Sequence, residues 1–244
     1  DSTAKIYTDL GLFTCNEQFG ADASSLFNVI TGYSRPPEYK HFIVAPHGMR
    51  SFFEYMIRQE TENAKKGLPS GITVKVNSLV DPKIIELLYE ASKAGVRVQL
   101  IVRGICCLIP GIEGVSENIT VMSIVGQLLE HSRIFRFENA GNPRIYMGSA
   151  DWMPRNLDRR VELVFPIEDE TQKARAFGIL DTMLSDTTNA RFMQSDTSYE
   201  HVDLRGKKKI SSQLTFYHEA QARLKELQSI EKDSVLIPIH SAEE

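Results

Sequence analysis

The stretch ITVKVNSLVDPKIIELLYEASKAGVRVQLIVRG, residues 72–104, predicts a strand, a helix and a second strand in immediate succession. Asp81 is placed to cap the helix, and Pro82 stands in its first turn, where the missing N–H costs nothing. Gly95 predicts the end of the helix. A strand, helix and strand with short connections indicate a βαβ unit, so we expect two parallel strands joined by a right-handed crossover.

The alternation of strands and helices continues on both sides of this unit. Apolar runs predict further strands at 6–14, 41–46, 118–125 and 161–167, and helices at 19–31, 50–65, 169–186 and 211–229. Mixed elements in this order favour an α/β fold, a mixed β-sheet flanked by helices. A Pro- and Gly-bearing polar stretch precedes residue 41, so we predict boundaries at 1–40, 41–230 and an acidic tail at 231–244.

Composition narrows the class of protein. The 244 residues are 42% hydrophobic and 25% charged, a profile typical of soluble globular domains. The sequence lacks both an apolar run of the roughly 20 residues that a membrane span needs and a signal-peptide pattern at its start. The net charge of -4 argues against a broad nucleic-acid-binding surface. Three cysteines without metal-ligand spacing suit a reducing cytoplasm, where we expect them as small buried residues.

The chemistry gathers in LLEHSRIFRFENAGNPRIYMGSADWM, residues 128–153. His131 and Arg133 are two apart, so on a strand they project from the same face. Gly-Asn-Pro predicts a turn, after which the chain returns antiparallel and brings Ser149 and Asp151 toward the His131 end. A histidine, a cation, a hydroxyl and a carboxylate are therefore expected in one small volume.

Such a group suits phosphoryl chemistry. A neutral His131 can attack phosphorus or protonate a leaving oxygen, and Arg133 can hold phosphoryl oxygens. Ser149 can donate to another oxygen or to the ring, and Asp151 can orient the imidazole or help to hold a metal. The spacing equally allows a structural pair between a histidine and a carboxylate, and it leaves both interpretations open.

A histidine and a basic residue followed after a gap by Gly-Ser-Ala-Asp resemble half of a phospholipase-D-like site. The resemblance extends further: YTDLGLFT, ITVKVNSLVDPKIIELLY, VRGICCLIPGIEGVSENI and GSADWMPRNLDRRVE together look like the C-terminal part of long-type bacterial polyphosphate kinases. The match runs from about residue 6 to about residue 228. It implies a phospholipase-D-like sheet and an enzyme that reversibly moves the terminal phosphate of ATP onto inorganic polyphosphate.

The resemblance also implies roles for single residues. Tyr7 matches the tyrosine beside the ATP base, and Arg103 and His131 match positions that contact the nucleotide phosphates. Arg133 takes the basic position of the motif, and Ser149 and Asp151 form its second limb. The basic stretch after the motif matches the lining of a polyphosphate channel through Arg155, Arg159 and Arg160.

The sequence departs from the family pattern because it contains only one phospholipase-D-like half. In the family the phosphate is carried by a histidine of a first phospholipase-D-like half, which would lie before residue 1, together with N-terminal domains. We therefore expect this chain to be inactive alone. We expect Mg²⁺ to bind together with ATP, with its ligands largely in that first half. We expect the full-length protein to be a cytoplasmic homo-oligomer, and the sequence leaves membrane association open. The alternatives are another phospholipase-D-like phosphodiesterase and a module that binds nucleotides or polyanions.

Overall fold

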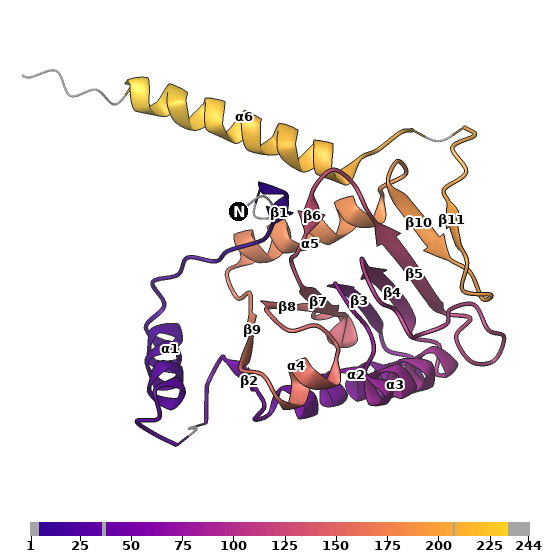
Figure 1. Cartoon of the computed structure of the whole chain (residues 1–244), viewed down its shortest axis with the longest axis horizontal. Helices are drawn as coiled ribbons and strands as arrows, with labels where there is room; N and C mark the ends of the chain where they lie inside the picture. Colours follow the sequence, from indigo (N-terminus) through magenta and orange to yellow (C-terminus); the bar gives the residue numbers. More distant parts are fainter. Residues whose placement is uncertain (1–4, 36–37, 207, 234–244) are drawn as a thin grey trace, which may run out of the picture.

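The computed structural model describes residues 5–35, 38–206 and 208–233, and most of the predicted tail at 231–244 lies outside them. In the described residues, nine strands form one mixed sheet with the order β11-β10-β5-β4-β3-β7-β8-β9-β2, and β1 pairs with β6 beside it (Figure 1). The strands are β1 (Tyr7–Thr8), β2 (Ile43–Ala45), β3 (Gly71–Val76), β4 (Arg97–Val102), β5 (Ile119–Ile124), β6 (Leu129–Glu130), β7 (Ile134–Phe137), β8 (Arg144–Gly148), β9 (Glu162–Pro166), β10 (Ala190–Met193) and β11 (Tyr199–His201). The helices are α1 (Glu17–Ile30), α2 (Met49–Lys65), α3 (Pro82–Lys93), α4 (Pro154–Asp158), α5 (Glu170–Leu184) and α6 (Ser212–Asp233).

The central βαβ unit is confirmed. β3 and β4 are parallel neighbours, and α3 crosses between them. The Asp81 side chain accepts a hydrogen bond from the main-chain N–H of Ile84, and Pro82 occupies the first turn of the helix. Gly95 follows the helix with a φ of 91°, a left-handed conformation that glycine adopts without strain.

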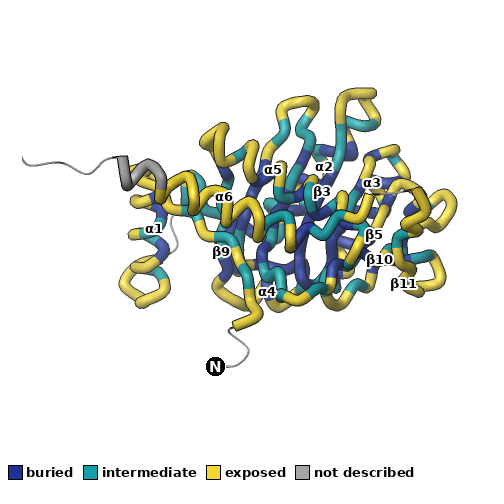
Figure 2. The backbone as a smooth tube through the Cα atoms, turned by 90° about the horizontal axis from the view of Figure 1, so that it is seen from above, coloured by how far each residue is buried: buried dark blue, intermediate teal, exposed yellow. Residues whose placement is uncertain are grey.

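The two faces of the sheet carry separate cores. On one face, alternate residues of β3 and β4 pack against α2 and α3 in a cluster that contains Phe53, Leu88 and Trp152. On the other face, α5 packs through Leu180 against a second cluster that contains Ile134. Figure 2 shows the sheet as the buried centre of the molecule, with the exposed surface on the outer elements. The predicted mixed sheet flanked by helices is thus confirmed.

Several details differ from the sequence predictions. The run 6–14 forms a strand only at Tyr7–Thr8, because only these residues find a partner, in β6. Four short elements, α4, β6, β10 and β11, were not predicted, since each is shorter than a periodic pattern that could reveal it. His131 and Arg133, expected on a strand, lie between β6 and β7, because the ladder is interrupted at residues 131–133. Cys15 and Cys107 are exposed rather than buried.

Candidate active site

Three segments that are far apart in the sequence meet at His131. The Tyr7 ring approaches its imidazole edge-on, with the ring centroids 5.1 Å apart and the planes at 81°. Arg103, directly after β4, brings Nη2 to 3.4 Å from the Nδ1 atom of the same imidazole. The side chains that the sequence assigned to a nucleotide site therefore lie in contact.

Main-chain pairing brings Tyr7 to the histidine. β1 runs parallel to β6, with Tyr7 opposite Leu129 and Thr8 opposite Glu130. The His131 N–H donates to the Thr8 carbonyl at 2.8 Å, and the Thr8 hydroxyl donates to the Glu130 carboxylate at 3.0 Å. These contacts fix both residues of β1, so a strand of only two residues can hold Tyr7 against His131.

The surroundings of His131 favour the neutral form of its imidazole. Burial lowers the pKa of His131, and the positive charges of Arg133 and Arg103 lower it further, while Asp9 and Asp151 oppose them. A guanidinium has only N–H donors, so Arg103 must donate to Nδ1. In the neutral ring the proton then resides on Nε2, which is a donor rather than a nucleophile.

Arg133 and Asp151 form an ion pair in the part of the protein that surrounds His131, which we call the wall of the site. Each of the two side chains is about one-tenth exposed. The Arg133 Nη2 atom donates to Oδ2 of Asp151 at 3.1 Å, and its Nη1 atom donates to the His131 carbonyl at 2.8 Å. The main-chain N–H groups of Asn77 and Ser78 donate to Oδ1 of Asp151. This corrects the expectation that Asp151 orients the imidazole, because both of its oxygens are paired elsewhere.

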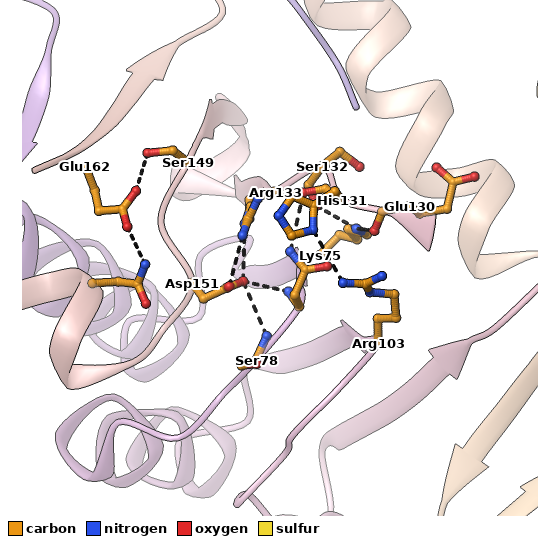
Figure 3. Close-up of polar contacts among 12 residues, drawn as sticks. Lys75, Ser78, Arg103, Glu130, His131, Ser132, Arg133, Ser149, Asp151 and Glu162 are labelled. Carbon is orange, nitrogen blue, oxygen red and sulfur yellow. Dashed lines mark hydrogen bonds and ion pairs between the residues drawn. The ribbon is translucent and has the colours of Figure 1, made fainter. Parts of the chain in front are cut away.

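Ser149 also departs from its expected position. Figure 3 shows it turned away from His131 and toward Glu162, to which its hydroxyl donates. The Leu163 N–H donates to the same hydroxyl at 3.1 Å, and Asn156 donates to the second oxygen of Glu162. Ser149 thus ties β8 to β9, and it lines a hollow of about 230 Å³ together with Arg133 and Asp9.

The comparisons with known proteins identify the family. Residues 42–213 match the family described as "Polyphosphate kinase C-terminal domain 2", and residues 1–36 match "Polyphosphate kinase C-terminal domain 1". The chain belongs to the polyphosphate kinase family.

Relatives of known name agree with this assignment. The polyphosphate kinase of Lactiplantibacillus plantarum is 50% identical over 225 residues, which are 92% of this chain and 31% of that protein. The polyphosphate kinase of Parasynechococcus marenigrum is 53% identical over 197 residues, 81% of this chain and 28% of that protein. The chain therefore spans about a third of the length of the curated relatives that it matches.

A solved structure of the family has the same fold. The polyphosphate kinase of Porphyromonas gingivalis superposes with a TM-score of 0.82 at 35% sequence identity, over 86% of this chain and 32% of that one. Within the described residues of the present chain, no helix is long and apolar enough to cross a membrane.

The three arginines assigned by resemblance to a polyphosphate channel lie on the surface. α4 and the turn after it expose Arg155, Arg159 and Arg160. Among the described residues, no ion pair within 4.0 Å joins these three side chains to a carboxylate. Their charge is thus available to an anion in solution.

Two side chains of the site were not predicted from the sequence. Lys75 and Asn77 of the β3 segment point to the same side as the site, and both are buried. Lys75 donates to the carbonyls of Glu130 and Ser132, and Asn77 donates to the carbonyl of His131. The signal was present in ITVKVN, where alternation places Thr73, Lys75 and Asn77 on one face of an otherwise apolar strand.

The described residues hold no cluster of carboxylates or other metal-ligating side chains at this site. Within them no group of three or more His, Cys, Asp or Glu side chains could hold a metal ion. Asp151, the carboxylate of the motif, already accepts hydrogen bonds from Arg133 and from two main-chain N–H groups. The wall of the site therefore offers hydrogen-bond donors and positive charge, which suit an anion.

Proposed function

We propose that this chain supplies the wall of a polyphosphate kinase active site that binds the phosphates of ATP, in an enzyme that reversibly transfers the terminal phosphate of ATP to inorganic polyphosphate. The observation that carries the proposal is the convergence of Tyr7, Arg103 and His131 from three separate segments. The family assignment of residues 42–213 supplies the reaction.

The roles follow from the hydrogen-bonding capacity of each group. Arg103 is half-buried, and its guanidinium carries further N–H donors for phosphate oxygens besides the one that meets His131. His131 donates through Nε2 to a phosphoryl oxygen, where it offsets negative charge that develops during transfer. The Tyr7 ring, which is exposed beside Arg103 and His131, offers an aromatic surface to the base.

Arg133 acts differently from Arg103 in this proposal. Its guanidinium is engaged by Asp151 and by the His131 carbonyl, so it contributes a fixed positive charge to the wall and faces the hollow beside it. Ser149 and Asp151 support the wall through hydrogen bonds to the neighbouring main chain. We assign Arg155, Arg159 and Arg160 to the path of the polyanion, because they are exposed and cationic.

The phosphate carrier belongs to another part of the enzyme in this proposal. Among the described residues His131 is the histidine at this site, and the Arg103 contact makes its ring a donor. We therefore assign the phosphohistidine to a histidine outside residues 1–244, and Mg²⁺ to the phosphates of ATP. ADP, polyphosphate, the remaining domains and further copies of the protein are the partners that the family assignment suggests.

The experiment compares binding with turnover in the 244-residue chain. We expect ATP and polyphosphate to bind and to compete, without ATP-dependent synthesis of polymer, and we expect no hydrolysis of a generic phosphodiester such as bis(4-nitrophenyl) phosphate. Robust polymer synthesis by the chain would refute the assignment of the carrier. Hydrolysis of the phosphodiester would refute the assigned reaction and favour a phosphodiesterase.

A further inference from the structure

The segment that carries His131 has little support from the sheet ladder. Residues 131–133 lie between β6 and β7 and belong to neither strand. Their main chain makes one hydrogen bond to β1, from the His131 N–H to Thr8, and a long one of 3.4 Å from the Gly148 N–H to the Arg133 carbonyl. Something other than a neighbouring strand must hold this segment in place.

Side chains take over the role of the ladder. Lys75 donates from Nζ to the carbonyls of Glu130 at 2.5 Å and of Ser132 at 2.6 Å. Asn77 donates from Nδ2 to the intervening carbonyl of His131 at 3.3 Å. Three successive peptide carbonyls are thus held by Lys75 of β3 and by Asn77, which directly follows β3, and Figure 3 shows Lys75 beside His131.

We propose that Lys75 is a positioning residue for His131: its amino group holds the carbonyls on both sides of the histidine and so fixes the direction in which the imidazole faces. The inference takes from the proposed function only that His131 is a functional group. The contacts of the ring with Tyr7 and Arg103 are the geometry that Lys75 preserves.

The free energy needed to bury the Lys75 amino group argues that this residue has a positioning role. Lys75 is only 2% exposed, in the centre of the sheet, and buried lysines are rare unless they are paired with an acid. Both hydrogen bonds from Nζ go to main-chain carbonyls, while Glu130 and Asp151 act on it only at longer range. An apolar side chain would satisfy the packing of β3 more cheaply, so the polar contacts themselves are what the lysine provides.

The test measures the state of the His131 ring in the full 244-residue chain. Long-range ¹H–¹⁵N NMR spectra report which nitrogen carries the proton, and the His131 signals are assigned by their loss in His131→Gln. The variant Lys75→Met removes the amino group and keeps the apolar stem. Thr73→Val is the matched control, because Thr73 lies on the same face of the same strand, two residues away, and is also buried.

In the parent chain and in Thr73→Val we expect one neutral tautomer with the proton on Nε2. In Lys75→Met we expect both tautomers, because the ring no longer faces Arg103 in a fixed direction, while the signals of the exposed His201 stay unchanged. A change of pKa alone could follow from the lost charge, so the tautomer decides. A folded Lys75→Met that keeps the single tautomer would overturn the proposal and leave Lys75 a structural residue.

If Lys75→Met does not fold, Lys75→Gln serves in its place. Its amide is shorter and reaches at most one of the two carbonyls, so we expect a mixture of tautomers, and an unchanged single tautomer would again overturn the inference. Failure of the proposed function is a separate result. It would show as an absence of ATP binding by the parent chain, whatever the tautomer of His131.

Discussion

The pair of Arg133 and Asp151 can be tested by a double-mutant cycle. Arg133→Met removes the cation and keeps most of the apolar stem, and Asp151→Asn removes the anion at nearly constant shape. Each single variant leaves one charged group without its partner in a place where the side chains are only 10% and 9% exposed. The double variant leaves neither charge.

The structure sets the size of the effect. Removal of one member of a buried ion pair costs about 3–5 kcal/mol of unfolding free energy. We expect about 3 kcal/mol for each single variant, because Asp151 keeps the N–H groups of Asn77 and Ser78 and Arg133 keeps the His131 carbonyl. The double variant should lose about 4 kcal/mol rather than the additive value of about 6, a coupling of about 2 kcal/mol.

Urea unfolding at pH 7 measures these values, with fluorescence of Trp152 as the probe. Trp152 is the single tryptophan of the chain, is fully buried and directly follows Asp151. If the two losses add to within about 0.5 kcal/mol, the residues are not coupled and the reasoning from the buried pair is refuted.

Three further predictions concern two glycines, the buried Lys75 and the exposed arginines. Gly148→Ala should lower the unfolding free energy by about 2 kcal/mol, because its Cβ would clash with the Leu163 carbonyl oxygen. Gly178→Ala, inside α5 at a site where the added Cβ meets no neighbouring element, should raise the unfolding free energy by about 0.5–1 kcal/mol in the same urea assay. Burial, with the charges of Arg103 and Arg133, lowers the pKa of Lys75 to about 7 against an ordinary 10.5. The unfolded chain therefore binds the extra proton between these values, so the stability of the parent chain relative to Lys75→Met should rise from pH 7 to pH 10, and a constant difference would contradict the burial of this amine. Replacement of the exposed arginines by Gln should weaken polyphosphate binding in calorimetry more than ATP binding, and an equal loss for both ligands would contradict the assigned channel; these arginines are Arg155, Arg159 and Arg160.

Periodic and capped elements were predictable from the sequence because their signals are local. The βαβ unit follows from apolar alternation, from Asp81 and Pro82 at the start of its helix, and from Gly95 at its end. The hairpin of β7 and β8 follows from two apolar runs around a turn. The strand predicted at 6–14 was too long because β-propensity does not say how many residues will find a partner.

The partners of the site residues were less predictable. Proximity along the hairpin suggested that Asp151 and Ser149 face His131, but hydrogen bonding depends on neighbours from β3 and β9 that the hairpin itself does not specify. The alternation of Thr73, Lys75 and Asn77 marks a polar face of this segment, but it does not say which groups the amino group of Lys75 will meet. Its function emerges only when β3 and β7 are paired and its amino group meets the carbonyls beside His131.

Calorimetry of ATP binding to the 244-residue chain tests most directly whether Arg103 and His131 bind the phosphates of ATP. Arg103→Gln removes a donor cation from the site, and Arg144→Gln removes an exposed arginine at the start of β8 as the matched control. We predict that Arg103→Gln weakens ATP binding by about tenfold or more, since a charge-assisted hydrogen bond contributes about 1.5–3 kcal/mol, while Arg144→Gln binds as the parent chain does. Equal affinity in the Arg103 variant, or no binding by the parent chain, would contradict the account.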